Sequence, residues 1–208
     1  MNSPPTIRTA SVTDAATVAY VVATAFHSLD VCQWLIPDPR ERAARLSDYF
    51  RIITDHAFRQ GTVHVTTDLN AVAVWLSCPF PDPAGYDTRL AAACGPWTAR
   101  FQNLDEQMYQ AHPHDRGPHD YLAFLAVMPS AQGKGLGSAL VEHHHAGLDR
   151  QRRPAYLEAS NARSRKLYDR AGYRDCAPPL DLPYQGESLF PMWREPARQS
   201  SPHADRAS

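Results

Sequence analysis

The stretch LAVMPSAQGKGLGSALV, residues 125–141, joins an apolar run, three glycines within five residues and what looks like the start of a helix. Loop glycines let the backbone approach a ligand closely, because no Cβ stands in the way. The first turn of the following helix presents unpaired N–H groups and the positive end of the helix dipole. With Gln132 and Lys134 beside these groups, the stretch predicts an anion site, best filled by phosphate.

Two common phosphate-binding motifs do not fit this stretch. A dinucleotide-binding fingerprint, G-x-G-x-x-G, requires glycine where the chain has Ser138 or Leu140. A P-loop requires glycine at Met128 and a hydroxyl residue at Gly135. The remaining alternatives are a different phosphate-binding loop and a tight strand-to-helix turn that holds no ligand.

The composition indicates an ordinary globular protein. The chain has 208 residues, of which 43% are hydrophobic and 21% charged, enough for one domain with a buried core. A net charge of −1 favours neither nucleic acid nor a membrane surface as partner. We find no signal-peptide pattern and no apolar run of about 18 residues, as a membrane span would need. The four cysteines form no C-x-x-C pair, which indicates reduced thiols in a cytoplasmic protein, with a disulfide as the alternative.

Apolar periodicity predicts one mixed α/β domain with the element order β-α-α-β-β-α-β-α-β-α-β-β. Residues 78–87 are expected to form a proline-rich loop, and residues 112–120 are expected to be irregular. The domain should cover residues 1–196, followed by a disordered tail over 197–208. The expected strands are 6–10, two hairpin arms within 62–77, 121–127, 155–160 and two segments within 173–196. The expected helices are 13–26, 41–59, 97–108, 136–149 and 161–172.

The glycine stretch resembles V-x-P-x-x-Q/R-x-x-G-x-G/A, the acetyl-CoA loop of the GCN5-related N-acetyltransferase (GNAT) superfamily. The matching residues are Val127, Pro129, Gln132, Gly135 and Gly137. The resemblance implies a mixed sheet of about six to seven strands, splayed between its two central parallel strands and flanked by helices. It also implies that loop amides wrap the coenzyme A pyrophosphate and that the strand ending at Val127 pairs with the pantetheine arm.

A second motif, YLEASNARSRKLYDRAGYR, resembles the superfamily signature N-x-x-[SA]-x-x-L-Y-x-x-x-G-[FY]. Asn161 and Tyr168 are seven residues apart and should share a helix face. The resemblance implies that Tyr168 is a general acid for the coenzyme A thiolate; the alternative is an amphipathic surface tyrosine. The cofactor-binding residues implied by the two motifs are Leu125, Ala126, Val127, Gln132, Gly133, Lys134, Gly135, Leu136, Gly137, Ser138, Asn161 and Ser164.

Longer stretches resemble one group within the superfamily, puromycin N-acetyltransferase and its actinobacterial relatives. These stretches are TIRTASVTDAATVAYVVATAF, NAVAVWLS, QGKGLGSALV and RPAYLEASNARSRKLYDRAGY. With gaps in the middle, the likeness covers roughly residues 6–195. It implies an antibiotic-like or metabolite amine as acceptor.

Amine acetylation needs a base, because an ammonium group has no lone pair. Some superfamily members place a glutamate on the strand before the glycine loop, but Tyr121 occupies that position here. Glu158 matches a glutamate of the puromycin enzyme and is costly in an otherwise apolar strand unless paired or functional. We therefore expect Glu158 to be the base, with a salt bridge or a hydrogen bond to Tyr168 as the structural alternative. His119 and Asp120 are the other candidates.

The acceptor usually lies against the segment that joins the first two helices in this superfamily. Phe26, Leu29 and Trp34 could line an aromatic or apolar site, with Asp30 facing a cationic amine; His119 and Asp120 complete the predicted acceptor set. The alternative for Phe26 and Trp34 is core packing. The puromycin enzyme has tyrosine where this chain has Leu29, and this difference argues against puromycin itself as the physiological substrate.

The histidines predict no metal site. Consecutive helix positions diverge by about 100°, so His143, His144 and His145 are expected to be solvated and not to converge on one ion. His112, His114 and His119 lack an accompanying set of cysteines or carboxylates in sequence.

Together these features predict a cytoplasmic, acetyl-CoA-dependent N-acetyltransferase, monomeric or homodimeric, with a small-molecule amine as partner. Direct transfer is expected, without a covalent acyl-enzyme, and a resistance role would follow from the family likeness. One alternative keeps the fold and takes a protein N-terminus or lysine as acceptor. The other is a non-catalytic acyl-CoA-binding regulatory domain.

Overall fold

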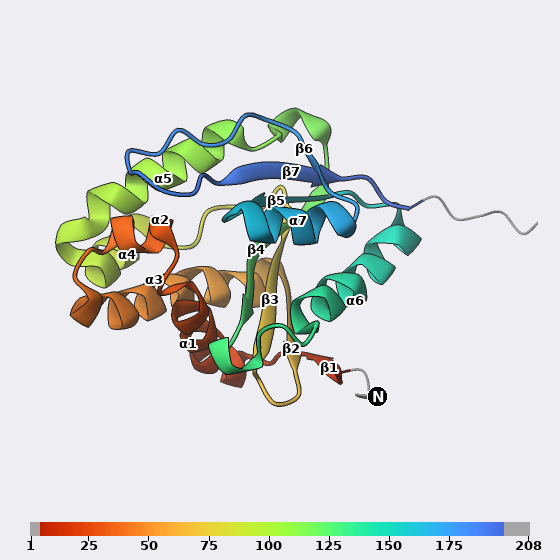
Figure 1. Ribbon diagram of the computed structural model, residues 1–208, viewed down its shortest axis with the longest axis horizontal. Coiled ribbons are helices and arrows are strands. Elements are labelled where there is room, and N and C mark those ends of the chain that lie inside the picture. Colours follow the sequence, from red (N-terminus) through yellow and green to blue (C-terminus); the bar gives the residue numbers. More distant parts are fainter. Residues whose placement is uncertain (1–4, 198–208) are drawn as a thin grey trace, which may run out of the picture.

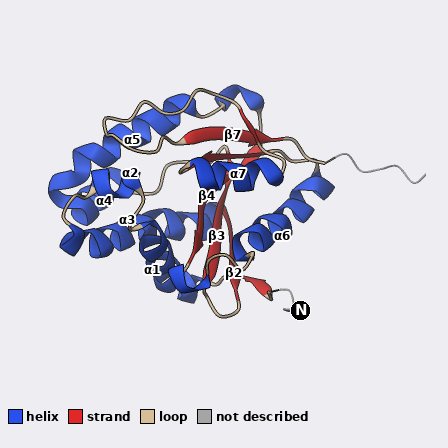
Figure 2. Ribbon diagram, in the orientation of Figure 1, coloured by secondary structure: helices blue, strands red, loops and turns tan. Residues whose placement is uncertain are grey.

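A computed structural model describes residues 5–197, which form one seven-stranded mixed sheet with helices on both faces (Figure 1). The strand order is β1-β2-β3-β4-β5-β7-β6. Figure 2 shows the sheet enclosed by helices. The predicted single α/β domain with six to seven strands is confirmed. The predicted tail, residues 197–208, lies outside the described residues except for Ala197.

The strands are β1 Ile7–Thr9, β2 Gly61–Thr66, β3 Ala71–Cys78, β4 His119–Val127, β5 Ala155–Ala159, β6 Arg174–Asp175 and β7 Phe190–Arg194. The helices are α1 Ala15–Phe26, α2 Asp30–Leu35, α3 Pro39–Gln60, α4 Tyr86–Cys94, α5 Thr98–Ala111, α6 Leu136–Gln151 and α7 Ala162–Arg170, joined in places by short 3₁₀ turns. No helix between residues 5 and 197 is both long enough and apolar enough to span a bilayer.

The sheet divides the core into two layers, each covered by helices. On β3, Val72, Val74 and Leu76 pack toward α1 and α3, whereas Ala73 and Trp75 pack toward α6 and α7. The period-two alternation of a strand produces this division. In Figure 1, α1 and α3 lie on one side of the upright β3 and β4, and α6 lies on the other.

The sheet opens between β4 and β5. These parallel strands pair only through Asp120 with Ala155 and Tyr121 with Tyr156, although β4 continues to Val127 and β5 to Ala159. Beyond those pairs, β5 is held by β7 on its other side. The splay implied by the family resemblance is therefore present, and it widens toward the carboxyl end of β4.

A bulge interrupts β4 next to this opening. Val74 pairs with Phe124 and Trp75 with Leu122, so Ala123 is an extra residue on β4. A bulge changes which face the following side chains point to and is often found beside an active site. Here it places Leu125 and Val127 on the α6 side and Ala126 on the α1 side of the sheet.

Helix α4 was not predicted from the sequence. The sequence predicted a single helix between the third and fourth strands, but α4 and α5 both lie there. Only three of the nine residues of α4 are buried, so its apolar pattern is weak. The predicted strand that begins at Tyr173 is likewise short, since β6 contains only Arg174 and Asp175.

Candidate functional site

The glycine loop runs from the end of β4 to the start of α6 and depends on two left-handed residues. Gly133 has φ +78° and Gly135 has φ +79°, a region that side chains with a Cβ rarely adopt. A Cβ built at either position would meet nothing within 4 Å. Glycine is therefore required by the backbone conformation, and the space beside it is open to a ligand.

The loop and the first turn of α6 present a row of N–H groups. Within residues 5–197, the N–H groups of residues 133–138 have no backbone or side-chain acceptor, and no side chain caps α6. Lys134 Nζ lies 3.3 Å from the carbonyl oxygen of Ser130, and Gln132 Nε2 donates to the carbonyl oxygen of Val127 at 3.2 Å. Free amides beside a lysine at a helix N-terminus can bind a phosphate.

The open edge of β4 continues from this loop into the molecule. Leu125, Ala126 and Val127 pair with β3 on one side, but the described β4–β5 ladder ends before them. On the α6 side, Gly137 approaches the side chains of Leu125 and Val127 so closely that a Cβ on it would lie 3.6 Å from Leu125 Cδ2. The three predicted cofactor residues of β4 thus line the splay directly below the glycine loop.

A cavity of about 750 Å³ lies on the opposite face of the sheet, between α3, α4, α5 and the first half of β4. Its aromatic wall includes Tyr49, Tyr86, Tyr109, Tyr121 and Phe124. Five carboxylate residues line it, and no lysine or arginine does so among the described residues. The acidic lining residues are Asp82, Asp87, Asp105, Glu106 and Glu158. This volume and lining suit a small cationic or aromatic ligand.

Glu158 projects into this cavity from β5. Its Oε2 accepts a hydrogen bond of 2.8 Å from the hydroxyl of Tyr121, and its Oε1 is shielded from solvent without a hydrogen-bond partner in residues 5–197. Burial raises the pKa of Glu158 to about 7, and the hydrogen bond from Tyr121, together with the nearby Tyr156 hydroxyl, opposes part of that rise. A carboxylate with this pKa exchanges protons near neutral pH, as a general base must.

Tyr168 is a residue of α7 on the other face of the sheet, and its side chain is turned toward the core. Its side chain is 7% exposed and packs edge-on against Tyr173, with 5.7 Å between the ring centroids. Burial raises the pKa of the Tyr168 hydroxyl, so the group stays protonated at neutral pH. Tyr168 is not part of the cavity lining; it belongs to the apolar cluster that contains Leu157 and Ala159.

Asn161 and Ser164 form the N-cap of α7. Asn161 Oδ1 accepts a hydrogen bond of 2.7 Å from the Ser164 amide, and Ser164 Oγ accepts from the Asn161 amide at 3.1 Å. This reciprocal pair is a capping box. The predicted cap is confirmed, and it engages the oxygen of the Asn161 side chain.

Most of the predicted acceptor residues lie away from the cavity. Phe26 packs against Phe50 and Phe124, and Leu29 belongs to the same apolar core. Trp34 stacks on Tyr184 at 5.7 Å, and Asp30 Oδ2 accepts from the Glu187 amide at 2.9 Å. These four assignments stay predictions, with structural roles now visible for each side chain.

The other two candidates, His119 and Asp120, point to opposite sides of the sheet. His119 lines the cavity. Asp120 forms an ion pair with Arg153 and a hydrogen bond of 2.9 Å with His144, beside a second hollow on the α6 face. Burial would raise the pKa of Asp120, but hydrogen bonds from His144 and Arg153 outweigh it and lower the pKa. Asp120 is therefore a poor proton acceptor near neutral pH.

Two of the three consecutive histidines are not solvated, contrary to the prediction. His144 stacks on Trp75 with 4.0 Å between ring centroids and lies 3.1 Å from His64 through its Nδ1. His145 is 6% exposed and lies 2.9 Å from the hydroxyl of Tyr173. The prediction treated all three histidines as solvent-facing, whereas His144 and His145 lie on the side of α6 that packs against the sheet.

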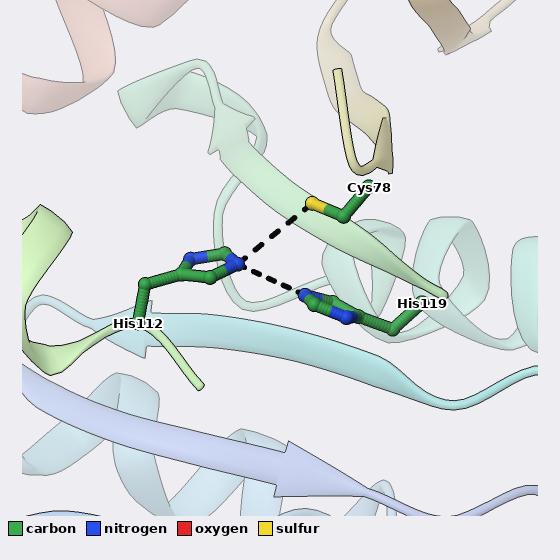
Figure 3. A group of neighbouring side chains, drawn as sticks. All are labelled: Cys78, His112 and His119. Carbon is green, nitrogen blue, oxygen red and sulfur yellow. Dashed lines mark hydrogen bonds between the residues drawn. The ribbon is translucent and has the colours of Figure 1, made fainter. Parts of the chain in front are cut away.

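Several cavity residues were not found from the sequence. Asp105 accepts a hydrogen bond of 2.7 Å from Tyr86, and burial raises its pKa to about 6. Cys78, His112 and His119 meet at one corner of the cavity (Figure 3). The prediction of no metal site assumed that no cysteine accompanies these histidines; Cys78 does, because β3 places it opposite His119.

Comparisons with known proteins agree with this geometry. Residues 97–175 match the model of the acetyltransferase (GNAT) domain family. The structure of "histone acetyltransferase HPA2 and related acetyltransferase" from Corynebacterium glutamicum is 30% identical, with 96% of this chain and all of that chain covered and a TM-score of 0.68. Arylalkylamine N-acetyltransferase 2 from Aedes aegypti shares the fold, at 16% identity and a TM-score of 0.63 over 94% of this chain and all of that one.

A curated relative, the 5-NmdU N-acetyltransferase of Pseudomonas phage PaMx11, is 33% identical over 78 residues. The match covers 38% of this chain and 54% of the phage protein, so the chain spans about half the length of that relative.

Proposed function

The chain belongs to the GNAT family of acetyltransferases and is an acyltransferase; from that premise we propose that it moves an acetyl group from acetyl-CoA directly onto a small-molecule amine. Enzymes of this family use acetyl-CoA. The proposal places the coenzyme in the glycine loop and the β4–β5 splay, and the amine in the cavity beside Glu158. One domain, residues 1–196, would carry all of these parts.

One observation carries the proposal: the splay joins two different sites on opposite faces of the sheet. The free amides of residues 133–138 stand at the start of α6, which packs on one face of the sheet, and the cavity with Glu158 lies on the other face. A thioester placed in the splay would be reached by an amine from the cavity. Its departing sulfur would face α7 and Tyr168. Binding both reactants at a shared opening favours direct transfer, because their reacting atoms are held in contact.

In the proposed reaction, Glu158 acts as the general base and Tyr168 as the general acid. Glu158 accepts a proton from the bound ammonium and frees the nitrogen lone pair for attack on the thioester carbonyl carbon. A C–N bond forms and the C–S bond breaks. Backbone N–H groups on the open edge of β4, near the bulge at Ala123, would stabilise the negative charge that develops on the carbonyl oxygen. Tyr168 then donates its proton to the coenzyme A thiolate. The second proton, which the nitrogen loses as the amide forms, replaces the one that Tyr168 gave up, and Glu158 releases its proton to solvent.

The cavity supports a small, cationic or aromatic acceptor. A volume of about 750 Å³ suits a compact ligand, and five lining carboxylates attract a protonated amine. The phage relative is named for acetylation of 5-NmdU, whereas the Corynebacterium relative is named for histone acetylation. The compact volume of the cavity favours the small molecule over a peptide, which would need an open groove. An antibiotic-like amine such as puromycin remains part of the proposal, on the resemblance of the sequence.

The test is release of coenzyme A from acetyl-CoA by the purified protein. The acceptor panel contains puromycin, aromatic and polycationic amines, a nucleoside amine and a lysine-containing peptide. The proposal expects amine-dependent release that is strongest with a compact cationic amine and that collapses in Tyr168→Phe and Glu158→Gln. Release with the peptide alone would establish a protein acceptor. Tight acetyl-CoA binding without release for any acceptor would favour a regulatory acyl-CoA-binding domain.

A further inference from the structure

Cys78, His112 and His119 converge from three separate elements at one end of the cavity (Figure 3). Cys78 ends β3 and is the direct cross-strand partner of His119 at the start of β4. His112 follows the last residue of α5. Antiparallel pairing fixes two of the three positions, and the end of α5 brings the third.

Their donor atoms have nearly the spacing of a metal site. All three lie within 4.8 Å of one another. His112 Nε2 is 3.0 Å from His119 Nε2 and 3.8 Å from Cys78 Sγ. Tetrahedral zinc, with bonds of about 2.0–2.1 Å to nitrogen and 2.3 Å to sulfur, requires separations of about 3.3–3.6 Å between these atoms. Shifts of a few tenths of an ångström would meet that requirement for both pairs involving His112. The Cys78–His119 pair, which lies within 4.8 Å, would have to close by up to about 1.2 Å.

The ring of His119 is already oriented as a ligand. Its Nδ1 lies 2.8 Å from the carbonyl oxygen of Gly117. A carbonyl oxygen only accepts, so Nδ1 carries the proton and the lone pair of Nε2 points toward His112 Nε2, 3.0 Å away. Histidines that bind metals commonly hold their second nitrogen in this way.

The surroundings hold the group rigidly. Cys78 is 6% exposed and His119 is 3% exposed. The His112 ring packs edge-on against Tyr156, with 4.6 Å between centroids, and His119 packs against Trp193 at 4.9 Å. Arg153 donates to the backbone oxygens of Cys78 and His119, but its charge is compensated by Asp120. Rigid ligands lose little conformational freedom when an ion binds.

We infer that Cys78, His112 and His119 form a binding site for a zinc-type divalent ion, with a fourth coordination position directed into the acceptor cavity. Imidazole and thiolate donors select Zn²⁺, Co²⁺ or a similar transition metal over Mg²⁺ and Ca²⁺. All three residues line the cavity, so water or a donor atom of the acceptor can take the open position. Binding releases the thiol proton to solvent, and the proton shared by the two Nε2 atoms moves to Nδ1 of His112.

The experiment uses the full chain, stripped of metal and titrated with Co²⁺. One ion per chain should bind, with the visible absorption of four-coordinate cobalt and a thiolate-to-cobalt charge-transfer band that Zn²⁺ abolishes. Cys78→Ser should remove the charge-transfer band. His112→Gln and His119→Gln should each weaken Co²⁺ binding by at least about 10- to 100-fold, the loss seen when a residue that only hydrogen-bonds to a metal ligand is replaced. Binding that none of the three variants alters would overturn the site.

Two controls separate this site from other histidines. His114→Gln changes another histidine of the same cavity, and His143→Gln changes an exposed histidine of the second hollow. Both should keep the affinity and the charge-transfer band. X-ray absorption of the zinc-loaded wild type provides a measurement without variants. A first shell of one sulfur, two imidazole nitrogens and one further light atom in the open position is expected, and a shell that lacks sulfur would contradict the assignment. Neither readout depends on acetyl transfer.

Discussion

The Tyr121 hydroxyl on β4 donates a hydrogen bond of 2.8 Å to Glu158 Oε2 on β5. The bond lies where the pairing of β4 with β5 ends, since Tyr121 with Tyr156 is the last pair of that ladder. Tyr121 occupies the position at which some family members carry a glutamate. The pair thus moves the carboxylate from β4 to the neighbouring strand while keeping it at the mouth of the splay. Two consequences for pH dependence follow from this relationship.

The first concerns activity. Burial raises the pKa of Glu158 to about 7, so the proposed base is protonated and inactive in acid. We expect kcat/KM to rise with pH through about 7, and Glu158→Gln to lower kcat by about 10²- to 10⁴-fold and remove this dependence. The Tyr121 hydrogen bond lowers that pKa, so Tyr121→Phe should move the midpoint to higher pH. A pH–rate profile whose midpoint is the same in Tyr121→Phe would argue against Glu158 as the titrating group.

The second concerns stability. The pKa of Glu158 rises from 4.5 to about 7 on folding, so the folded state binds this proton more tightly. That contribution to stability is fully present below about pH 4.5 and is lost as the pH rises through 7. Glu158→Gln should therefore gain stability relative to wild type between pH 5 and 8, by about 1–3 kcal/mol. Urea unfolding at several pH values measures the difference, and a difference that does not change with pH would refute the shift.

Tyr168 is the proposed acid, and Tyr173 is its matched control. Tyr168→Phe should lower kcat by about 10²- to 10⁴-fold with little change in acetyl-CoA affinity, because only proton donation is lost. Tyr173→Phe removes a buried hydroxyl 2.9 Å from His145 Nε2 and should cost about 1–3 kcal/mol of stability, with kcat preserved. Steady-state kinetics and thermal unfolding of both variants test this. Equal kcat losses would reduce Tyr168 to a packing role.

Alanine variants of Gly135 and Gly85 distinguish the effect of backbone strain from an effect on cofactor binding. Both have positive φ, +79° and +64°, and a Cβ at either would meet nothing within 4 Å. Alanine at each position should cost about 1–2 kcal/mol of stability, because both must keep a left-handed conformation. Only Gly135→Ala should also weaken acetyl-CoA binding, since its methyl group would enter the proposed phosphate site. Calorimetric titration with coenzyme A measures this, and equal affinities for the two variants would remove the loop from the site.

The sequence was most informative where chemistry and backbone conformation coincide. The glycines at 133 and 135 and the Asn161 cap followed from short motifs with local physical causes, whereas the β4–β5 splay was implied by the family resemblance. The acceptor cavity did not, because its wall is assembled from α3, α4, α5 and β4, which are far apart in the sequence. Residues such as Asp105 and Cys78 show no local pattern that marks them as neighbours.

The face of the sheet to which a side chain points was also beyond the sequence. Strand alternation places Glu158 on the cavity side and Leu157 and Ala159 in the apolar cluster on the other side. The bulge at Ala123 reverses the alternation of side chains in β4, and the sequence of that strand contains no glycine or proline that would have indicated a bulge. His119 and Asp120, adjacent in sequence and predicted as one pair, serve opposite faces because successive strand residues alternate.

Asp120 therefore provides a test between the sequence-based role and the structural one. It is 6% exposed and compensates Arg153 while accepting from His144. Asp120→Asn keeps the shape but leaves the Arg153 charge without its partner, which should cost about 3–5 kcal/mol of stability. The acceptor KM should stay within about twofold of wild type, because the side chain faces away from the cavity. Glu106→Gln, which changes a carboxylate of the cavity lining, should raise that KM with little effect on stability. The opposite pattern, a stable Asp120→Asn variant with a raised acceptor KM, would show that Asp120 contributes to acceptor binding.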